Sequence, residues 1–247
     1  MDTLSFRFKE IYKLLWEAYG PQHWWPAESL LEVMVGAILT QNTNWQGVEK
    51  AMAYLKRHDL LAPDKLQALP AEELAQLIKP AGYFNLKARR LKNLLEFVTE
   101  TYSGDLEAMK QVDTGLLRKQ LLAVNGVGPE TADSILLYGF HRPIFVVDNY
   151  TRRIISRHGL GGNKAGYKEL QELFMQNLPL DASMFNEFHA LLVMVGKLHC
   201  QRKPRCVGCP LEPLLPRAIH WARRKDAGTR RNGETGIKGQ RTEGTRD

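Results

Sequence analysis

Apolar residues recur at helical spacing along most of the chain, and short polar breaks separate the segments that carry them. These segments are 29–39, 46–56, 71–78, 87–101, 113–123, 129–140, 150–158, 167–176 and 186–198. Residues 1–19 add an amphipathic helix in which charged residues interrupt the apolar ones. Only 144–147 is a candidate for an extended segment, and neither an internal repeat nor a βαβ pattern is present. The pattern predicts an all-α protein.

Composition adds a core and a basic character to this picture. The chain has 247 residues and is 44% hydrophobic, so it can bury a substantial core. Its net charge of +7 and pI near 9.3 favour a polyanionic partner, although many soluble proteins are equally basic. Six Arg and two Lys against four acidic residues give 223–247 a net charge of +4. We expect 217–247 to be a disordered basic tail that adds nonspecific phosphate attraction at most.

No targeting segment is evident in the sequence. Residues 1–19 lack the apolar run of a signal peptide, and stretches such as 33–39 are far too short to span a bilayer of about 30 Å. We therefore expect a cytoplasmic protein with no membrane contact. Its three cysteines are then expected to remain unpaired.

Residues 122–133, with the sequence LAVNGVGPETAD, form the most informative segment. They join two predicted helices through a tight Gly-x-Gly turn, and Pro129 is tolerated where the second helix begins. Gly126 and Gly128 can adopt positive φ and have no Cβ, so backbone N–H groups of the turn can approach an anion closely. A DNA phosphate suits this geometry, and an ordinary turn between helices is the alternative.

Together with Val146-Val147-Asp148, this segment resembles the helix-hairpin-helix and catalytic-aspartate region of the endonuclease III superfamily of DNA glycosylases. Residues 35–43 (VGAILTQNT) are similar to that superfamily's helix leading to a glutamine that inserts into the duplex. The resemblance implies a two-lobed helix-hairpin-helix fold with the active cleft between the lobes. We expect a six-helix lobe at 26–140, and a second lobe from 1–25 and 141–216 that carries a cysteine loop.

Asp148 is the leading catalytic candidate. It precedes a predicted helix and is therefore also a good helix N-cap, a purely structural role that is compatible with a catalytic one. In the superfamily that this segment resembles, the matching carboxylate supports the sugar as positive charge develops and helps to position or deprotonate water. A fixed anion facing such a centre is a large source of catalysis.

Glu130 decides which chemistry the resemblance allows. Bifunctional members carry a lysine at the matching position, and its amine forms a Schiff base with the sugar before strand cleavage. A glutamate cannot form that imine, and in the first turn of a helix it has a favourable structural role. We therefore expect a monofunctional enzyme that uses water as the nucleophile and has no lyase activity.

Aromatic residues suggest where a flipped base would bind. Trp24, Trp25, Pro26 and Trp45, with Glu130, are similar to the base pocket of the 3-methyladenine branch related to endonuclease III. Trp25 and Trp45 are the positions expected to stack on the base. Stacking offsets part of the cost of flipping, and a cationic base such as 3-methyladenine gains more from an aromatic face. Packing in the core is the alternative for each tryptophan.

The resemblance also implies residues that contact DNA. Gln41 matches the residue that fills the gap left by the flipped nucleotide. The full expected set is Gln41, Asn42, Asn125, Gly126, Val127, Gly128 and Thr131.

The cysteine loop departs from the family pattern. Relatives with a 4Fe-4S cluster have Cys-x6-Cys-x2-Cys-x5-Cys, whereas this chain has Cys200-x5-Cys206-x2-Cys209 and Leu215 at the fourth position. Three alternatives remain open: a 4Fe-4S cluster with another ligand, a zinc site completed by His199 or His220, and a loop with free thiols. In the third, Arg202, Lys203 and Arg205 could still contact phosphate.

The sequence therefore predicts a base-excision repair glycosylase, monomeric and associated with the nucleoid, whose partner is double-stranded DNA containing damaged bases. Its expected reaction is hydrolysis of the N-glycosidic bond of an alkylated purine, which leaves an abasic site. Excision of an oxidised pyrimidine or a mismatched base is the first alternative. The second is a noncatalytic protein that binds damaged DNA.

Overall fold

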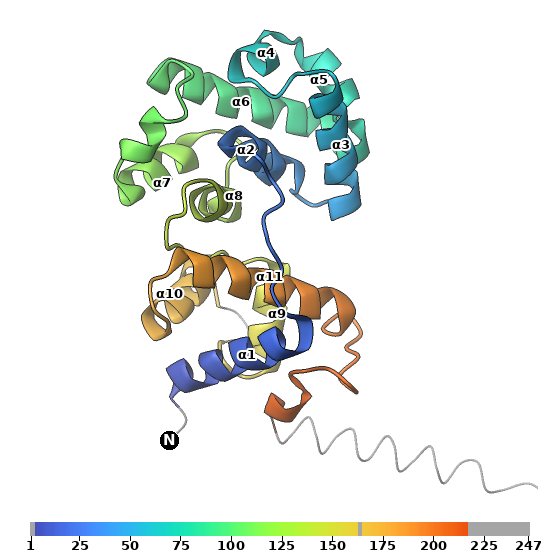
Figure 1. Cartoon of the computed structure of the whole chain (residues 1–247), viewed down its shortest axis with the longest axis vertical. Helices are drawn as coiled ribbons and strands as arrows, with labels where there is room; N and C mark the ends of the chain where they lie inside the picture. The colour runs from blue at the N-terminus through green and yellow to red at the C-terminus, as the bar shows by residue number, and fades with distance from the viewer. Residues whose placement is uncertain (1–2, 163–164, 217–247) are drawn as a thin grey trace, which may run out of the picture.

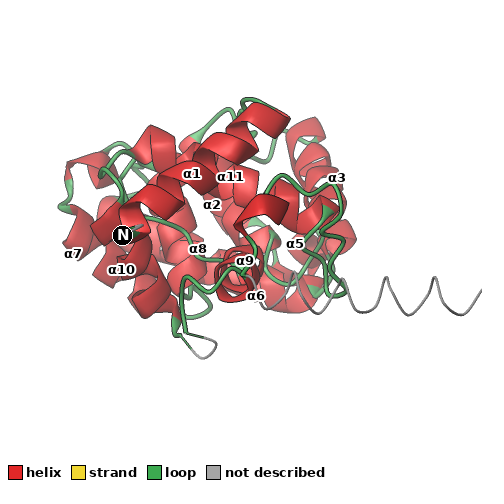
Figure 2. Cartoon of the chain, turned by 90° about the horizontal axis from the view of Figure 1, so that it is seen from below, coloured by secondary structure: helices red, strands yellow, loops and turns green. Residues whose placement is uncertain are grey.

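A computed structural model of the chain describes residues 3–162 and 165–216, and the regular secondary structure of this part of the chain is all helical (Figures 1 and 2). The helices are α1 Leu4–Tyr19, α2 Leu30–Leu39, α3 Trp45–Arg57, α4 Pro63–Ala68, α5 Ala71–Leu77, α6 Phe84–Tyr102, α7 Thr114–Ala123, α8 Pro129–Ser134, α9 Asn149–Arg157, α10 Tyr167–Asn177 and α11 Ala182–Leu198. Short 3-10 turns lie at Lys79–Ala81, Ala108–Gln111 and Glu212–Leu214. The expected basic tail, 217–247, lies outside the described residues.

The predicted all-α fold class is confirmed, and polar caps explain several of the helix boundaries. Ser29, Asn44, Asp113, Asp148 and Asp181 each accept a hydrogen bond from a backbone N–H in the first turn of the following helix. Such a cap stabilises a helix by about 1 kcal/mol. The sequence missed α4, which has six residues and buries only Leu66, too little for a periodic pattern.

Residues 141–148 contain no strand within the described structure, although 144–147 were a candidate for one. The segment is an extended, buried connection between the π-helical turn Ile135–Gly139, which directly follows α8, and α9. Phe145 and Val147 of this connection are almost completely inaccessible to water. Asp148 therefore lies at the start of α9, directly after a buried segment.

Two hydrophobic cores divide the described helices into two groups (Figure 1). The first core is built mainly by α2 to α8, and the second by α1, α9, α10, α11 and the connection after the π-helical turn. Helix α2 is buried along nearly its whole length. Val33 on α2 and Leu137 on the π-helical turn belong to the second core, so the two groups share apolar contacts. No helix in the described part of the chain is both long and apolar enough to cross a membrane.

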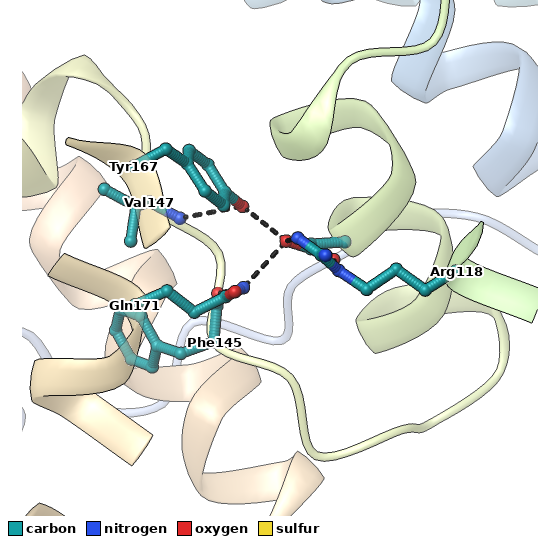
Figure 3. A network of polar contacts seen from close by, with 6 residues as sticks. Arg118, Phe145, Val147, Tyr167 and Gln171 are labelled. Atoms are coloured by element: carbon teal, nitrogen blue, oxygen red, sulfur yellow. Dashed lines mark hydrogen bonds and ion pairs between the residues drawn. The ribbon is translucent and has the colours of Figure 1, made fainter. Parts of the chain in front are cut away.

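A buried carboxylate links the two groups of helices. Asp133 on α8 is inaccessible to water, and Nε and Nη2 of Arg118 on α7 donate to it at 2.6 and 3.0 Å. From α10, the Tyr167 hydroxyl donates to the same carboxylate at 2.9 Å and Gln171 Nε2 donates at 2.7 Å (Figure 3). Every lone-pair direction of a buried anion needs such a partner, and here the partners come from both groups.

The same residues hold the connection that leads to Asp148. Gln171 Nε2 also donates to the carbonyl of Phe145 at 2.7 Å, and the Tyr167 hydroxyl accepts the N–H of Val147 at 3.5 Å. Residues 145–147 are therefore fixed to α10 through the partners of Asp133.

Replacing Asp133 with Ala should be strongly destabilising, because it leaves Arg118 and two polar groups of α10 without their shared acceptor. The expected loss in the free energy of unfolding is about 3–5 kcal/mol, measured by urea denaturation. The control is Glu172→Ala on α10. It removes an exposed ion pair with Lys168 and should lower the free energy of unfolding by about 0.5 kcal/mol or less. Equal losses in the two variants would contradict the role given to Asp133.

Candidate active site

A cleft of about 710 Å³ opens where the two groups of helices meet. Sequence-predicted residues from distant parts of the chain line it together: Trp24, Trp25, Gln41, Asn42, Trp45, Gly126, Val127, Gly128, Glu130, Thr131 and Asp148. Pro26 and Asn125 do not line this cleft. The structure therefore gathers most of the candidate residues at one place.

Asp148 is held by the start of its own helix. Its Oδ1 accepts the N–H of Thr151 at 2.7 Å, which makes it the N-cap of α9 as expected. Its Oδ2 lies 3.7 Å from Nε2 of His189 on α11. One carboxylate oxygen is thus hydrogen-bonded to the helix, while the other lies next to His189. The side chain is 14% exposed, so a substrate can reach it.

Behind Asp148, a buried pair of polar side chains connects α11 with the π-helical turn. Nδ1 of His189 lies 2.6 Å from the hydroxyl of Tyr138. Burial lowers the pKa of His189, although the nearby Asp148 acts in the opposite direction. Burial, with Asp148 as a second cause, raises the pKa of Tyr138 well above its ordinary value. At neutral pH both side chains are therefore uncharged.

Three tryptophan rings form an aromatic wall of the cleft. Ring centroids of Trp24 and Trp45 are 4.7 Å apart, those of Trp25 and Trp45 are 5.1 Å apart, and Trp25 lies 5.0 Å from Tyr138. Trp25 packs directly on Gly36 of α2, where a Cβ would lie 3.0 Å from its ring. The rings are half-buried, so they present apolar faces to the cleft while packing against the protein.

Pro26, which the sequence predicted in the base pocket, does not line this cleft. It lies one residue beyond the aromatic wall and lines a separate cavity of about 240 Å³, together with Glu49 and Met52 of α3. The resemblance of Trp24-Trp25-Pro26 to the base pocket of the 3-methyladenine branch was the reason for including it, and a contact of Pro26 with the base stays a prediction.

Glu130 lies on the cleft wall near Asp148, in the first turn of α8. Water reaches its carboxylate through the mouth of the cleft. Partial burial in the cleft nevertheless raises the pKa of Glu130 to about 7. The negative charge of Asp148 raises it further, and the positive charge of Arg152 lowers it. Glu130 and Asp148 thus place two interacting carboxyl groups in one cleft, and Glu130 supplies no amine.

The hairpin between α7 and α8 has one left-handed glycine where the sequence allowed two. Gly126 has φ of +97°, and a Cβ there would lie 2.3 Å from Cγ of Arg90. Gly128 has an ordinary extended conformation, with φ of −92°, and caps α8. Only Gly126 therefore needs to be glycine for conformational reasons.

Gln41 is bonded to this hairpin. Its Nε2 donates to the carbonyl of Gly126 at 3.0 Å and to the hydroxyl of Thr131 at 2.9 Å, and its Oε1 accepts from Arg90. Buried Lys87 holds the same loop, because its ammonium donates to the carbonyls of Leu39 and Ala81 at 2.7 Å each. Burial lowers the pKa of Lys87 to about 8. Gln41 is therefore held against the hairpin while it lines the cleft, and its insertion into a duplex stays a prediction.

The other expected DNA contacts divide into exposed and buried residues. Asn42 and Asn125 are exposed, and the carbonyl of Asn125 accepts from Asn93 at 3.0 Å. Thr131 is only 6% exposed, and its hydroxyl accepts from Gln41. The Val127 side chain is also buried.

The three cysteines do not provide a four-thiolate cluster site. Leu215 at the fourth position is buried and apolar, and Cys200 Sγ accepts from Arg157 at 3.2 Å. In the described residues, no group of three or more His, Cys, Asp or Glu side chains is arranged to hold a metal ion. His199 Nδ1 instead lies 3.1 Å from the carbonyl of Arg205, and His220 is outside the described residues.

Arginine side chains hold this loop to the second group of helices. Arg157 of α9 donates to the carbonyls of Gln201 and Arg202 at 2.7 and 3.1 Å. Arg153 donates to the carbonyl of Cys200. Three cysteines with an apolar Leu215 at the fourth position do not complete a four-thiolate site, and the chemistry of the cleft is derived without a cluster.

Sequence reasoning missed Tyr138, His189 and Lys197. Tyr138 falls within a segment that reads as ordinary core, and His189 interrupts the apolar face of α11 as a single polar residue, which was the only available signal. Lys197 also lines the cleft, with its ammonium 6.0 Å from the centroid of Trp24. Only the packing of α11 against the π-helical turn brings these residues to Asp148.

Comparison with known proteins identifies relatives over most of the chain. A Methanocaldococcus jannaschii protein assigned as a DNA repair glycosylase is 51% identical over 205 residues, covering 82% of this chain and 93% of that protein. Endonuclease III of Sulfolobus acidocaldarius is 30% identical over 185 residues, covering 73% of this chain and 79% of its own.

Solved structures share the fold. The 3-methyladenine DNA glycosylase MagIII of H. pylori, bound to 1,N6-ethenoadenine, has a TM-score of 0.66 at 28% identity and covers 79% of this chain and 97% of its own. Endonuclease III in a non-covalent DNA complex has a TM-score of 0.76 at 22% identity, covering 89% of this chain and 98% of its own.

The resemblance drawn from the hairpin and Asp148 segments is thus confirmed. Residues 35–180 match the family described as HhH-GPD superfamily base excision DNA repair protein, and the region includes both segments. The chain belongs to the HhH-GPD superfamily of base excision DNA repair proteins.

Proposed function

We propose that this DNA glycosylase is monofunctional and hydrolyses the N-glycosidic bond of an alkylated purine. The observation that carries the proposal is the composition of the cleft: three tryptophans line it together with Asp148, and a carboxylate, Glu130, stands where a lyase needs an amine. The similarity to the H. pylori 3-methyladenine glycosylase supports the same substrate class.

Duplex DNA would bind across the mouth of the cleft. The hairpin presents the exposed backbone around Asn125, and Arg90 and Lys197 add positive charge beside it. Contacts of this kind with phosphate position a duplex without reading its sequence. They suit an enzyme that must find a damaged base in any sequence context.

The aromatic wall would hold the flipped base. Taking a base out of the stack costs a few kcal/mol, and stacking on an aromatic side chain returns about 1–3 kcal/mol per base. A purine alkylated at a ring nitrogen is positively charged, so the faces of Trp25 and Trp45 attract it further. Such a base is already a good leaving group, and the site needs no strong general acid to expel it.

Asp148 would stabilise the sugar as the bond breaks. Its Oδ1 is fixed by the N–H of Thr151, and the carboxylate therefore faces the developing positive charge without reorganising. Water supplies the nucleophile, since Glu130 cannot form an imine. The products are a free base and an abasic strand.

The direct test is incubation of the purified protein with alkylated duplex DNA. Released bases are separated by chromatography, and the product strand is analysed with and without alkali. We expect release of 3-methyladenine and strand breakage only after alkali. No release from alkylated DNA would refute the proposed substrate, and release from oxidised or mismatched DNA instead would support the first alternative. Binding to damaged duplex without release of any base would support a noncatalytic role.

Asp148→Asn should abolish excision while preserving the fold, because an asparagine can still cap α9. We expect the single-turnover rate to fall by about 100-fold or more, with affinity for damaged duplex unchanged. The control is Asp181→Asn, which makes the same change at the N-cap of α11 and should leave the rate unaltered. If both variants excise at the native rate, Asp148 has no catalytic role.

Trp25→Leu should weaken binding of the flipped base through loss of an aromatic face. We expect the rate at which a cationic alkylated purine is excised, measured with limiting enzyme, to fall by about 10- to 100-fold. The rate for a neutral base should fall less. Trp16→Leu is the control, since Trp16 is an exposed residue of α1 outside the cleft. Equal effects of the two changes would argue against stacking on Trp25.

Glu130 should make stability depend on pH. Its pKa is raised to about 7 in the folded protein, so the folded state binds the proton more strongly than the unfolded chain. The stability that protonation of Glu130 contributes is therefore fully present below the ordinary pKa of a glutamate. It is lost as the pH rises through about 7. Glu130→Gln, which cannot ionise, should have a higher Tm than the native protein at about pH 8, and the gain should disappear near pH 5.

Glu172→Gln on the exposed face of α10 is the matched control for this measurement. It should show no gain at either pH. A Glu130→Gln gain that does not change with pH would mean that the carboxyl does not titrate in this range.

A further inference from the structure

His189 has an unused donor that points at the catalytic carboxylate. Its Nε2 is buried and has no hydrogen-bond partner in the described structure, and it lies 3.7 Å from Asp148 Oδ2. That separation is too long for a direct hydrogen bond. A buried polar atom without a partner is costly, so its presence on the wall of the cleft calls for a ligand.

Tyr138 determines which nitrogen of His189 carries the hydrogen. The phenol stays protonated because burial raises its pKa, and the imidazole stays neutral because burial lowers its pKa. Within the described residues, Nδ1 of His189 is the acceptor within hydrogen-bond distance of the Tyr138 hydroxyl, at 2.6 Å. The hydroxyl therefore donates to Nδ1, and the hydrogen of the neutral ring is on Nε2.

Asp148 offers the complementary group. Its Oδ1 accepts the N–H of Thr151, and the lone pairs of Oδ2 face the Nε2–H of His189 across the gap. A donor and an acceptor separated by this distance can both bond to one water molecule placed beside the line between them. Such a water would accept from Nε2 and donate to Oδ2.

We propose that His189 and Asp148 together hold the water that attacks the sugar, an inference that rests on the proposed glycosylase function. A lone pair of the water oxygen forms the bond to the anomeric carbon, and the N-glycosidic bond breaks with its electron pair moving to the base. The water proton passes to Asp148 Oδ2, and a cationic alkylated purine leaves as the neutral base. His189 supplies orientation and stays neutral throughout.

Two substitutions of His189 with side chains of similar length distinguish the role of its N–H donor from the role of its volume. His189→Gln keeps an N–H donor, whereas His189→Met removes it. We expect the single-turnover rate of base release to fall by about 100-fold in His189→Met and by about 10-fold or less in His189→Gln. Affinity for a duplex with a stable abasic analogue, and Tm, should match within this pair.

Tyr138→Phe provides a second test that keeps the ring packed against Trp25. Without the hydroxyl, the hydrogen of His189 can move to Nδ1, and we expect the rate to fall by about 10-fold. This variant decides the question if His189→Met does not fold, because native activity in Tyr138→Phe would overturn the proposal.

The outcomes also separate this proposal from the function on which it rests. If the native protein releases base while His189→Met is equally fast, or if Met and Gln are equally slow, the role of His189 is wrong and the glycosylase assignment stands. If the native protein releases no base from any damaged duplex, both fail.

Discussion

The buried carboxylate of Asp133 is the interaction on which the geometry of the cleft depends. It has no exposure to water, so its charge is tolerated only because Arg118, Tyr167 and Gln171 all donate to it. These donors belong to helices on both sides of the cleft. Gln171 and Tyr167 also bind the backbone that leads to Asp148. One anion thereby links the helix that follows the hairpin to the backbone that leads to Asp148.

The groups that line the cleft come from different elements of the fold. The aromatic wall lies on the segment before α2 and at the start of α3, while Asp148 begins α9 and His189 lies on α11. The π-helical turn carries Tyr138 between them, which agrees with the frequent use of such turns at functional sites. Fixed groups of this kind can stabilise developing charge without moving, and this suits the proposed cleavage of an N-glycosidic bond.

Much of the fold was predictable because it depends on local physics. Periodic apolar residues, polar caps such as Asp113 and Asp181, and the Gly-x-Gly hairpin all indicate helices from a few neighbouring residues. Asp148 could be proposed because its cap and its family motif coincide. Pro26 could not be assigned to the smaller cavity that it lines, because that cavity also involves Glu49 and Met52 of α3.

The rest depended on contacts between distant segments. His189 and Tyr138 are far apart in sequence and meet only when α11 packs on the π-helical turn. The bond from Gln41 to the carbonyl of Gly126 likewise requires the hairpin to lie beside its loop. In the cysteine loop, Arg157 and Leu215 occupy the surroundings of the thiols, which the cysteine spacing could not reveal.

The central claim is that water, and not an amine of the protein, attacks the sugar in this cleft. The measurement that tests it most directly is a single-turnover reaction on a duplex with one alkylated purine, quenched with borohydride. Borohydride reduces an imine to a stable cross-link between protein and DNA. The account predicts complete release of the base with no cross-linked species. A cross-link that accumulates with base release would contradict it and assign the attack to an amine elsewhere in the chain.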